Sequence, residues 1–153
     1  MFQEEKFLKI TDRKKEIFKT SGGKYIVPQA MENKFKESRF IEQIMVVGEG
    51  EKFPAAFIVP NFAYIREWAE KKGDDFSTLS NAEIANSQLV FDQINLVVNE
   101  YNQQYGNWEQ LKKFSLLEKE FSIAANELTP TLKLKRKKIM ENYQHLYSKM
   151  YAN

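Results

Sequence analysis

The chain has 153 residues, no cysteine, one histidine and a formal net charge of +2, with 23 Lys and Arg against 21 Asp and Glu. These numbers exclude disulfides, thiolate metal sites, cysteine nucleophiles and zinc sites built from several imidazoles, and they argue against a protein that binds polyanions over its whole surface. With 42% hydrophobic and 29% charged residues, the sequence predicts one globular domain that lacks much of the equipment of a complete enzyme.

The N-terminal part predicts short extended segments. Residues 7–11 alternate between apolar and polar side chains like a half-buried strand, and residues 16–19 form a second extended run. The charged turn 12–15 between them predicts a hairpin. Residues 20–23 (Thr-Ser-Gly-Gly) predict a flexible loop, in which glycine allows a positive φ or the close approach of a ligand.

The next segment predicts a helix followed by two strands. Pro28 suits the first turn of a helix, whose inner face we expect to hold Met31, Phe35 and Ala30. The β-branched runs 41–47 and 55–59 are typical of central strands joined by a turn.

Helices dominate the second half. Asn61 is a good N-cap for a helix ending near Gly73, the segment 74–80 predicts a loop, and Asn81 is placed to cap a short helix. Three further elements are predicted in chain order: a helix over 89–105 ended by Gly106, a strand over 113–117 and a helix over 137–151. The order predicts an α+β fold, a small and mostly antiparallel sheet with helices packed on it.

The beginning of the chain shows no secretory signal, and the longest apolar runs of the sequence, such as 55–59, are too short to span a bilayer, so we expect a cytoplasmic protein. Residues 1–6 carry no capping or strand pattern. They fit a linker remnant cut from something longer and an ordinary frayed terminus equally well. The folded domain is expected over 7–153.

One motif joins the charged turn to the glycine loop over residues 12–26. Arg13 can donate to hydroxyls or phosphates, and the backbone N–H groups of the glycine loop can approach a ligand. The spacing does not fit a Walker phosphate-binding loop. A solvated surface turn is the simpler interpretation of these residues taken alone.

A second motif is the basic run near the C-terminus, where five of the six residues 133–138 are Lys or Arg. Such a run can neutralise phosphates, and its positive charge at the start of a helix opposes the helix dipole unless an anion offsets it. The alternative function is therefore a module that binds nucleic acid or anionic lipid through residues 133–138.

Together, the two motifs resemble the C-terminal domain of the adenylate-forming acyl-CoA synthetases, and most closely the long-chain fatty acyl-CoA synthetases. The stretch from Ile10 to Gln29 resembles the hinge motif of that family, and Leu128 to Arg136 resembles its C-terminal lysine motif. The resemblance covers nearly the whole chain. It implies the small mobile domain of a long-chain fatty acid–CoA ligase, expected to be inactive alone because the N-terminal catalytic domain is absent.

The resemblance also implies a reaction in two halves. A fatty carboxylate first attacks the α-phosphate of ATP to give acyl-AMP and diphosphate, and the thiol of CoA then attacks the acyl-AMP carbonyl. The small domain rotates about a hinge between the halves and presents a different face to the same site, which keeps water from the mixed anhydride.

Site residues carry over by position. Arg13 matches the arginine that contacts the AMP ribose, and Lys15, two residues later, matches the hinge. Lys19 matches a lysine that faces the site in the thioester-forming pose of some relatives. Ser21, Gly22 and Gly23 match the loop along the pantetheine tunnel, and which glycine lines it stays open because the loop carries one extra residue compared with short-chain members.

Lys133 matches the adenylation lysine, which bridges the carboxylate and the α-phosphate where charge grows. Many family members have glycine just before it, whereas Leu132 stands here, and this leaves Lys135 as a second candidate. The partners implied are the protein's own N-terminal domain, the fatty acid, ATP with Mg²⁺, and CoA. Neither a metal site in this domain nor nucleic acid is expected, and peripheral membrane association of the full enzyme is left open.

Overall fold

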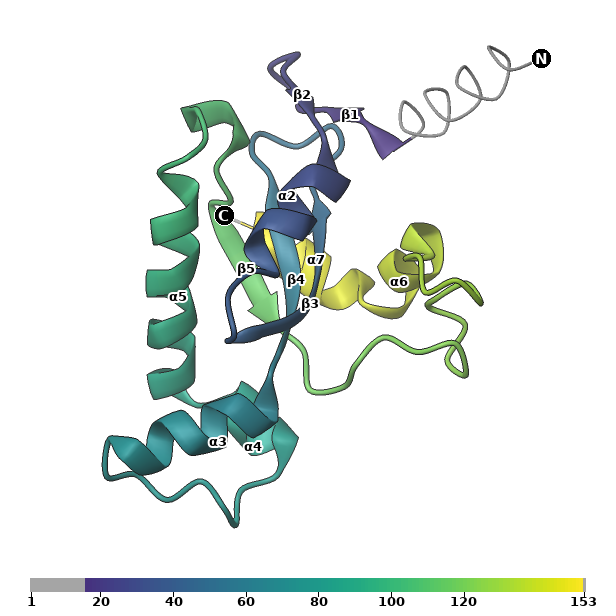
Figure 1. Ribbon diagram of the computed structural model, residues 1–153. Helices are drawn as coiled ribbons and strands as arrows, with labels where there is room; N and C mark the ends of the chain where they lie inside the picture. Colours follow the sequence, from purple (N-terminus) through teal and green to yellow (C-terminus); the bar gives the residue numbers. More distant parts are fainter. Residues whose placement is uncertain (1–15, 153) are drawn as a thin grey trace, which may run out of the picture.

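The computed structural model describes residues 16–152 of the chain as an α+β fold, which confirms the predicted class (Figure 1). In chain order the strands and helices are β1 (Phe18–Lys19), β2 (Tyr25–Ile26), α2 (Pro28–Phe35), β3 (Ile41–Val47), β4 (Ala55–Pro60), α3 (Phe62–Lys71), α4 (Asn81–Ala85), α5 (Gln88–Asn102), the 3-10 turn η1 (Asn107–Glu109), β5 (Lys113–Leu116), α6 (Arg136–Asn142) and α7 (Gln144–Tyr151).

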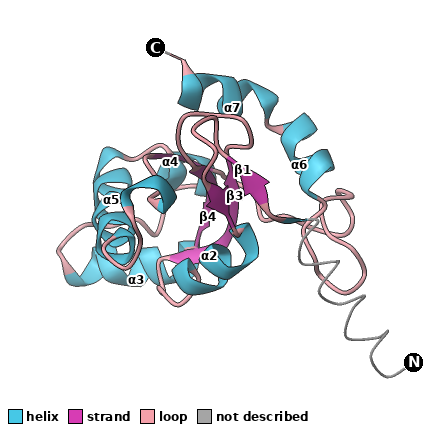
Figure 2. Ribbon diagram, turned by 90° about the horizontal axis from the view of Figure 1, so that it is seen from above, coloured by secondary structure: helices cyan, strands magenta, loops and turns pink. Residues whose placement is uncertain are grey.

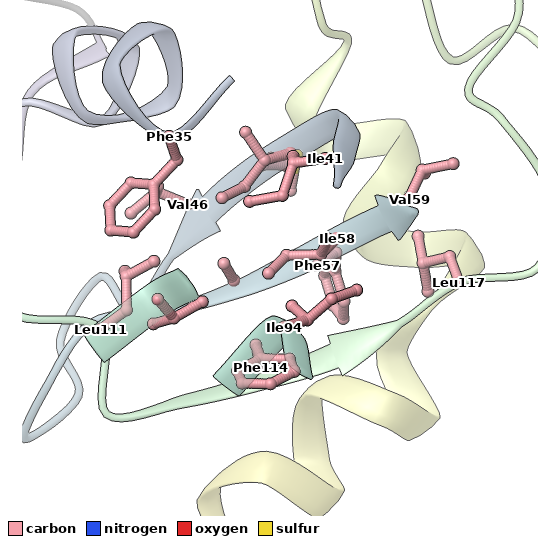
Figure 3. Close-up of a cluster of buried hydrophobic side chains, with 14 of the residues drawn as sticks. Phe35, Ile41, Val46, Phe57, Ile58, Val59, Ile94, Leu111, Phe114 and Leu117 are labelled. Carbon is pink, nitrogen blue, oxygen red and sulfur yellow. The ribbon is translucent and has the colours of Figure 1, made fainter. Parts of the chain in front are cut away.

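The core is built on a three-stranded sheet in the order β3-β4-β5. Strand β4 occupies the middle, and all six of its residues are buried. It pairs antiparallel with β3 and parallel with β5, as when Ile58 lies opposite Ile44 on one side and Leu116 on the other. Side chains from this sheet, from α2 and from α5 meet in one apolar cluster (Figure 3).

Helices cover both faces of the sheet. Figures 1 and 2 show α2 on one face and α7 on the other, with α5 beside the strands. Helix α2 packs against α5 and the turn after it through aromatic contacts, since the Phe35 ring centroid lies 5.5 Å from that of Tyr101 in α5 and 6.2 Å from that of Tyr105 beyond it. The parallel β4–β5 pairing needs a crossover, which α3, α4 and α5 supply.

Most predicted elements are confirmed within a few residues. Pro28 occupies the first turn of α2, and Asn61 caps α3 by accepting a 3.1 Å hydrogen bond from the Tyr64 N–H. Two local predictions are wrong. Ala30 is exposed, because the buried face of α2 runs instead through Glu32. Helix α4 is capped by Ser80 in a reciprocal capping box with Glu83, so Asn81 is already helical.

Two helix boundaries also differ from the sequence prediction. Helix α5 ends at Asn102 and passes through turns before Gly106, where a Cβ would meet the Trp108 ring at 2.6 Å. The single helix predicted over 137–151 is broken at Tyr143, whose φ of −118° and ψ of 24° separate α6 from α7. The Tyr143 ring contacts the rings of Phe57 and Phe121 at the break.

At the N-terminal end, β1 pairs antiparallel with β2, with Phe18 opposite Ile26. The predicted linker 1–6, the strand 7–11 and the turn 12–15 lie outside the described residues, so the hairpin predicted there stays a prediction. Among residues 16–152, no helix is both long and apolar enough to cross a membrane.

Candidate functional site

The glycine loop is the tight connection between β1 and β2. Thr20 closes it: its N–H donates to the Lys24 carbonyl at 2.9 Å, and its carbonyl accepts from the Gly23 N–H at 3.0 Å. Gly23 has a φ of +81°, a backbone conformation that residues other than glycine rarely adopt. Ser21, Gly22 and Gly23 are all exposed, so the loop presents backbone to the surroundings.

The β3–β4 turn holds this loop in place. The Ser21 N–H donates to the Glu51 carbonyl at 2.8 Å, and the Gly50 N–H donates to the Lys19 carbonyl at 2.8 Å. Lys19, at the end of β1, is exposed, and its Nζ lies 5.1 Å from the centroid of the Tyr25 ring. The structure therefore places Lys19 beside the three small loop residues, on one hairpin.

A second exposed hairpin carries Lys133. Leu128 and Leu134 pair as an antiparallel bridge, and the Thr129 N–H donates to the Lys133 carbonyl at 2.9 Å. The turn closes with the Leu132 N–H donating to the Thr129 carbonyl at 2.7 Å, and the Thr129 hydroxyl accepts from the Lys133 N–H at 3.0 Å. Lys133 itself is exposed.

Leu132 adopts the left-handed conformation in this hairpin, with a φ of +66° and 66% of its surface exposed. A three-residue hairpin loop commonly ends in such a left-handed residue, and glycine is the residue that adopts it without strain. The backbone at Leu132 therefore has a conformation that suits glycine. This is the position at which the family that the sequence resembles often has glycine.

Lys135, the second candidate for the adenylation lysine, lies at the base of the same hairpin. Its N–H donates to the Glu127 carbonyl at 2.8 Å, its Nζ donates to the Asn126 side chain, and it is partly buried. Lys133 near the tip and Lys135 at the base thus differ in exposure and in hydrogen bonding.

An ion pair between a partly buried arginine and a buried carboxylate joins the Lys133 hairpin to α2. Arg136 donates from both terminal nitrogens to the two carboxylate oxygens of Glu32, each at 2.7 Å. The Val46 N–H donates to the same carboxylate at 2.8 Å, and Glu32 is 5% exposed. Burial raises the pKa of the Glu32 carboxyl, while the hydrogen bonds from Arg136 and Val46 oppose that shift.

A polar cleft of about 380 Å³ lies between α2, β3 and this hairpin. Lys133, Arg136 and Glu32 line it, together with Glu16 at the start of the described chain. Glu16 lies 3.9 Å from the Arg136 guanidinium. The structure therefore brings Glu16 of the first motif and the second motif to one cleft, whereas the glycine loop is held elsewhere, on the β3–β4 turn.

Arg13 and Lys15 lie outside the described residues, so their roles stay predictions. Glu32 was missed by the sequence reasoning. The sequence feature that could have pointed to it is a carboxylate next to Met31 on a helix whose inner face was expected at Met31 and Phe35, since a charge on a buried face needs a partner. Within residues 16–152, no three His, Asp or Glu side chains come close enough to hold a metal ion.

The basic run 133–138 is not one free cationic strip. The Arg136 guanidinium is paired with Glu32, and the Lys135 ammonium contacts Asn126. The Glu32 carboxylate is an anion next to Arg136, the first residue of α6. It offsets positive charge at this helix start, for which the run itself contains no acidic residue. This geometry weakens the case for a nucleic-acid or anionic-lipid module based on that run.

Comparison with known proteins identifies similar sequences. The family described as the AMP-binding enzyme C-terminal domain matches residues 15–153. The chain is 32% identical over 155 residues to long chain acyl-CoA synthetase 2 of Arabidopsis thaliana, covering 99% of this chain and 23% of that protein. It is also 32% identical over 148 residues to long-chain-fatty-acid–CoA ligase 1 of Homo sapiens, covering 95% and 21%. The chain thus spans less than a quarter of these curated relatives.

Solved structures show the same fold. The adenylation domain of a carboxylate reductase from Mycobacterium chelonae matches with a TM-score of 0.67 and 22% identity, covering 92% of this chain and 20% of that chain. The adenylation domain of a carboxylic acid reductase from Segniliparus rugosus, solved with AMP and a co-purified carboxylic acid, matches with a TM-score of 0.66 and 20% identity over 91% of this chain and 20% of that chain.

Proposed function

Because the chain belongs to the AMP-binding enzyme C-terminal domain family, we propose that it is the mobile lid of a long-chain fatty acid–CoA ligase. The lid closes on an N-terminal domain that binds ATP and the fatty acid. The complete enzyme forms acyl-AMP and diphosphate and then transfers the acyl group to CoA. We expect the 153-residue chain alone not to turn over, and a cytoplasmic location stays a prediction.

The observation that carries this proposal is that two exposed loops are held by different elements of the core. The Lys133 hairpin is linked to Glu32 of α2 through Arg136, whereas the glycine loop is held by the β3–β4 turn. Figure 1 shows β1 and β2 at one end of the molecule and the chain entering α6 at another. Because each loop is fixed to the core, rotation of the domain as a rigid body can exchange the loop that faces the reaction site.

In the adenylation pose, we assign Lys133 the electrostatic role. Its exposed ammonium near the tip of a hairpin can reach a bound α-phosphate and carboxylate without unfolding the domain. Its positive charge stabilises negative charge that grows in the transition state. The exposure and the position near the tip favour Lys133 over Lys135 for this role.

In the thioester-forming pose, we assign the glycine loop and Lys19 to the path of CoA. Ser21, Gly22 and Gly23 offer exposed backbone to the slender pantetheine chain, and Lys19 lies at the start of the loop. By resemblance, we assign to Arg13 the contact with the AMP ribose and to Lys15 the hinge position. The described residues bring together no carboxylate cluster that fits Mg²⁺, so no step is assigned to a metal held by this domain.

The experiment joins this chain to its N-terminal domain and replaces Lys133→Ala. Fatty-acid-dependent exchange between diphosphate and ATP measures adenylation, and consumption of synthetic acyl-AMP with CoA measures the second half. We expect adenylation to fall by about 10²–10³-fold, while the second half changes little.

Lys137→Ala is the matched control, because it removes the same charge from an exposed lysine four positions away. Lys135→Ala tests the second candidate. Equal rates for wild type and Lys133→Ala in both halves would contradict the role of Lys133, and a wild-type enzyme without either half-reaction would contradict the proposed function itself.

A further inference from the structure

The Glu32–Arg136 pair connects the body of the domain to the segment that bears Lys133, and 104 residues separate its members in sequence. Arg136 is the first residue of α6 and follows Lys133 by three positions. We propose that Glu32 is a positioning residue for Lys133: through Arg136 it sets the place of the Lys133 hairpin and thereby supports adenylation. This inference rests on the proposed function.

The Glu32 carboxylate is itself fixed by the core. Its Oε2 accepts from the Val46 N–H of β3 at 2.8 Å, and the side chain is almost fully buried. Strand β3 is paired along its length with β4, the central strand of the sheet. The carboxylate is therefore a stationary acceptor, and the position of Arg136 follows from it.

The bidentate geometry fixes direction as well as distance. Two parallel hydrogen bonds of 2.7 Å align the guanidinium plane with the carboxylate plane, which a lysine in place of arginine cannot do. An ion pair taken out of water often adds little net stability compared with apolar packing, and in some proteins its benefit is a unique arrangement of the groups that it joins.

The other ties of the hairpin to the core are apolar: Leu128 is buried and Leu134 packs against the buried cluster. Below Lys133, the Leu128–Leu134 bridge and the 2.8 Å bond from the Lys135 N–H to the Glu127 carbonyl hold the two arms of the hairpin to each other. These bonds fix the shape of the hairpin but not its place relative to α2 and β3. Arg136, at the end of the second arm, adds to the apolar contacts a polar link of defined direction to Glu32 of α2.

The first test uses the 153-residue chain and measures amide hydrogen exchange in the variant Glu32→Gln. The glutamine carbonyl can still accept from the Val46 N–H, so the variant removes mainly the charge that holds Arg136. We expect the Leu132, Lys133 and Lys135 amides to exchange about tenfold faster, with the amides of β3 and β4 unchanged.

Glu37→Gln is the matched control on the segment after α2, because Glu37 pairs with Lys34 on the surface at 3.5 Å. It should leave exchange in the hairpin unchanged. Unchanged exchange in Glu32→Gln, or faster exchange throughout β3 and β4, would overturn the positioning role without reference to any enzymatic activity.

The second test measures both half-reactions in the enzyme joined to its N-terminal domain. We expect Glu32→Gln and Arg136→Lys to lower the kcat of adenylation by about tenfold or more. Thioester formation from synthetic acyl-AMP should stay within about twofold, because the glycine loop has its own support on the β3–β4 turn.

A common loss in both half-reactions would show a merely structural role and overturn the inference, as would unchanged adenylation. The wild type and Lys133→Ala are measured alongside. If wild type lacks both half-reactions, the proposed function fails, whereas a normal wild type with unaffected Glu32→Gln contradicts only the positioning role.

Discussion

Tyr147 donates a 2.7 Å hydrogen bond from its phenol to the carboxylate of Glu51, although 96 residues separate the two in sequence. The backbone carbonyl of Glu51 in turn accepts from Ser21 in the glycine loop at 2.8 Å. Tyr151 makes a parallel contact, donating to the Phe53 carbonyl at 2.8 Å. Helix α7 therefore buttresses the turn on which the glycine loop rests.

Alkaline pH tests this contact. Burial, followed by the hydrogen bond to Glu51, raises the pKa of Tyr147, and burial together with the neighbouring Tyr147 and Glu51 raises the pKa of Tyr151. Above about pH 10, the unfolded chain releases phenol protons that the folded chain keeps. The contribution of these two tyrosines to the free energy of unfolding should therefore be fully present below about pH 10 and decrease as the pH rises beyond it.

Phenolate absorbance and denaturant midpoints across this range provide the measurement. We expect Tyr147→Phe to be less stable than wild type by about 1 kcal/mol at neutral pH and to lose stability less steeply in alkali. Full ionisation of all seven tyrosines near pH 10 in a chain that remains folded would contradict the shifts.

Substitutions at Leu132 test the backbone strain next to Lys133. At a φ of +66°, a leucine costs energy that glycine does not, and its exposed side chain contributes little burial. We expect Leu132→Gly to be more stable than Leu132→Ala by about 1 kcal/mol in urea unfolding. Both variants remove the leucine, so the difference between them reports the backbone conformation, and equal stability would argue against it.

Gly23 and Gly22 should respond differently to a methyl group. A Cβ on Gly23 would meet nothing within 4 Å, but its φ of +81° disfavours alanine. A Cβ on Gly22 would lie 4.0 Å from the Thr20 hydroxyl, which is an ordinary contact. We expect Gly23→Ala to cost about 1–2 kcal/mol of unfolding free energy and Gly22→Ala less than about 0.5 kcal/mol.

Thermal or urea unfolding of the two alanine variants checks the order. The reverse order would show that the loop conformation differs from the one described here. Under the proposed function, Gly22 then becomes the position at which a larger side chain can be tested for an effect on CoA without a large loss of folding.

Sequence reasoning worked best where local chemistry decides structure. The apolar runs 41–47 and 55–59, Pro28 at the start of α2 and Asn61 before α3 all specify their elements from nearby residues. It did less well where a distant neighbour decides. Tyr143 falls within a good helical pattern, yet the chain bends there beside Phe57 and Phe121.

The candidate site divides in the same way. The sequence alone predicted that two motifs near opposite ends carry the chemistry, including Lys19, the glycine loop and Lys133, because each motif is a short local stretch that resembles one family. It also determined the apolar strands of the core, since β-branched runs bury themselves in any sheet.

Only the tertiary structure decided which side chains support these motifs. Periodicity placed a face of α2 inward, but it could not say that Glu32 on that face meets Arg136, or that Tyr147 meets Glu51. Such pairs depend on the relative positions of elements about 100 residues apart. Those positions follow from packing the whole core, because a buried charge or phenol is stable only where the fold brings it a partner.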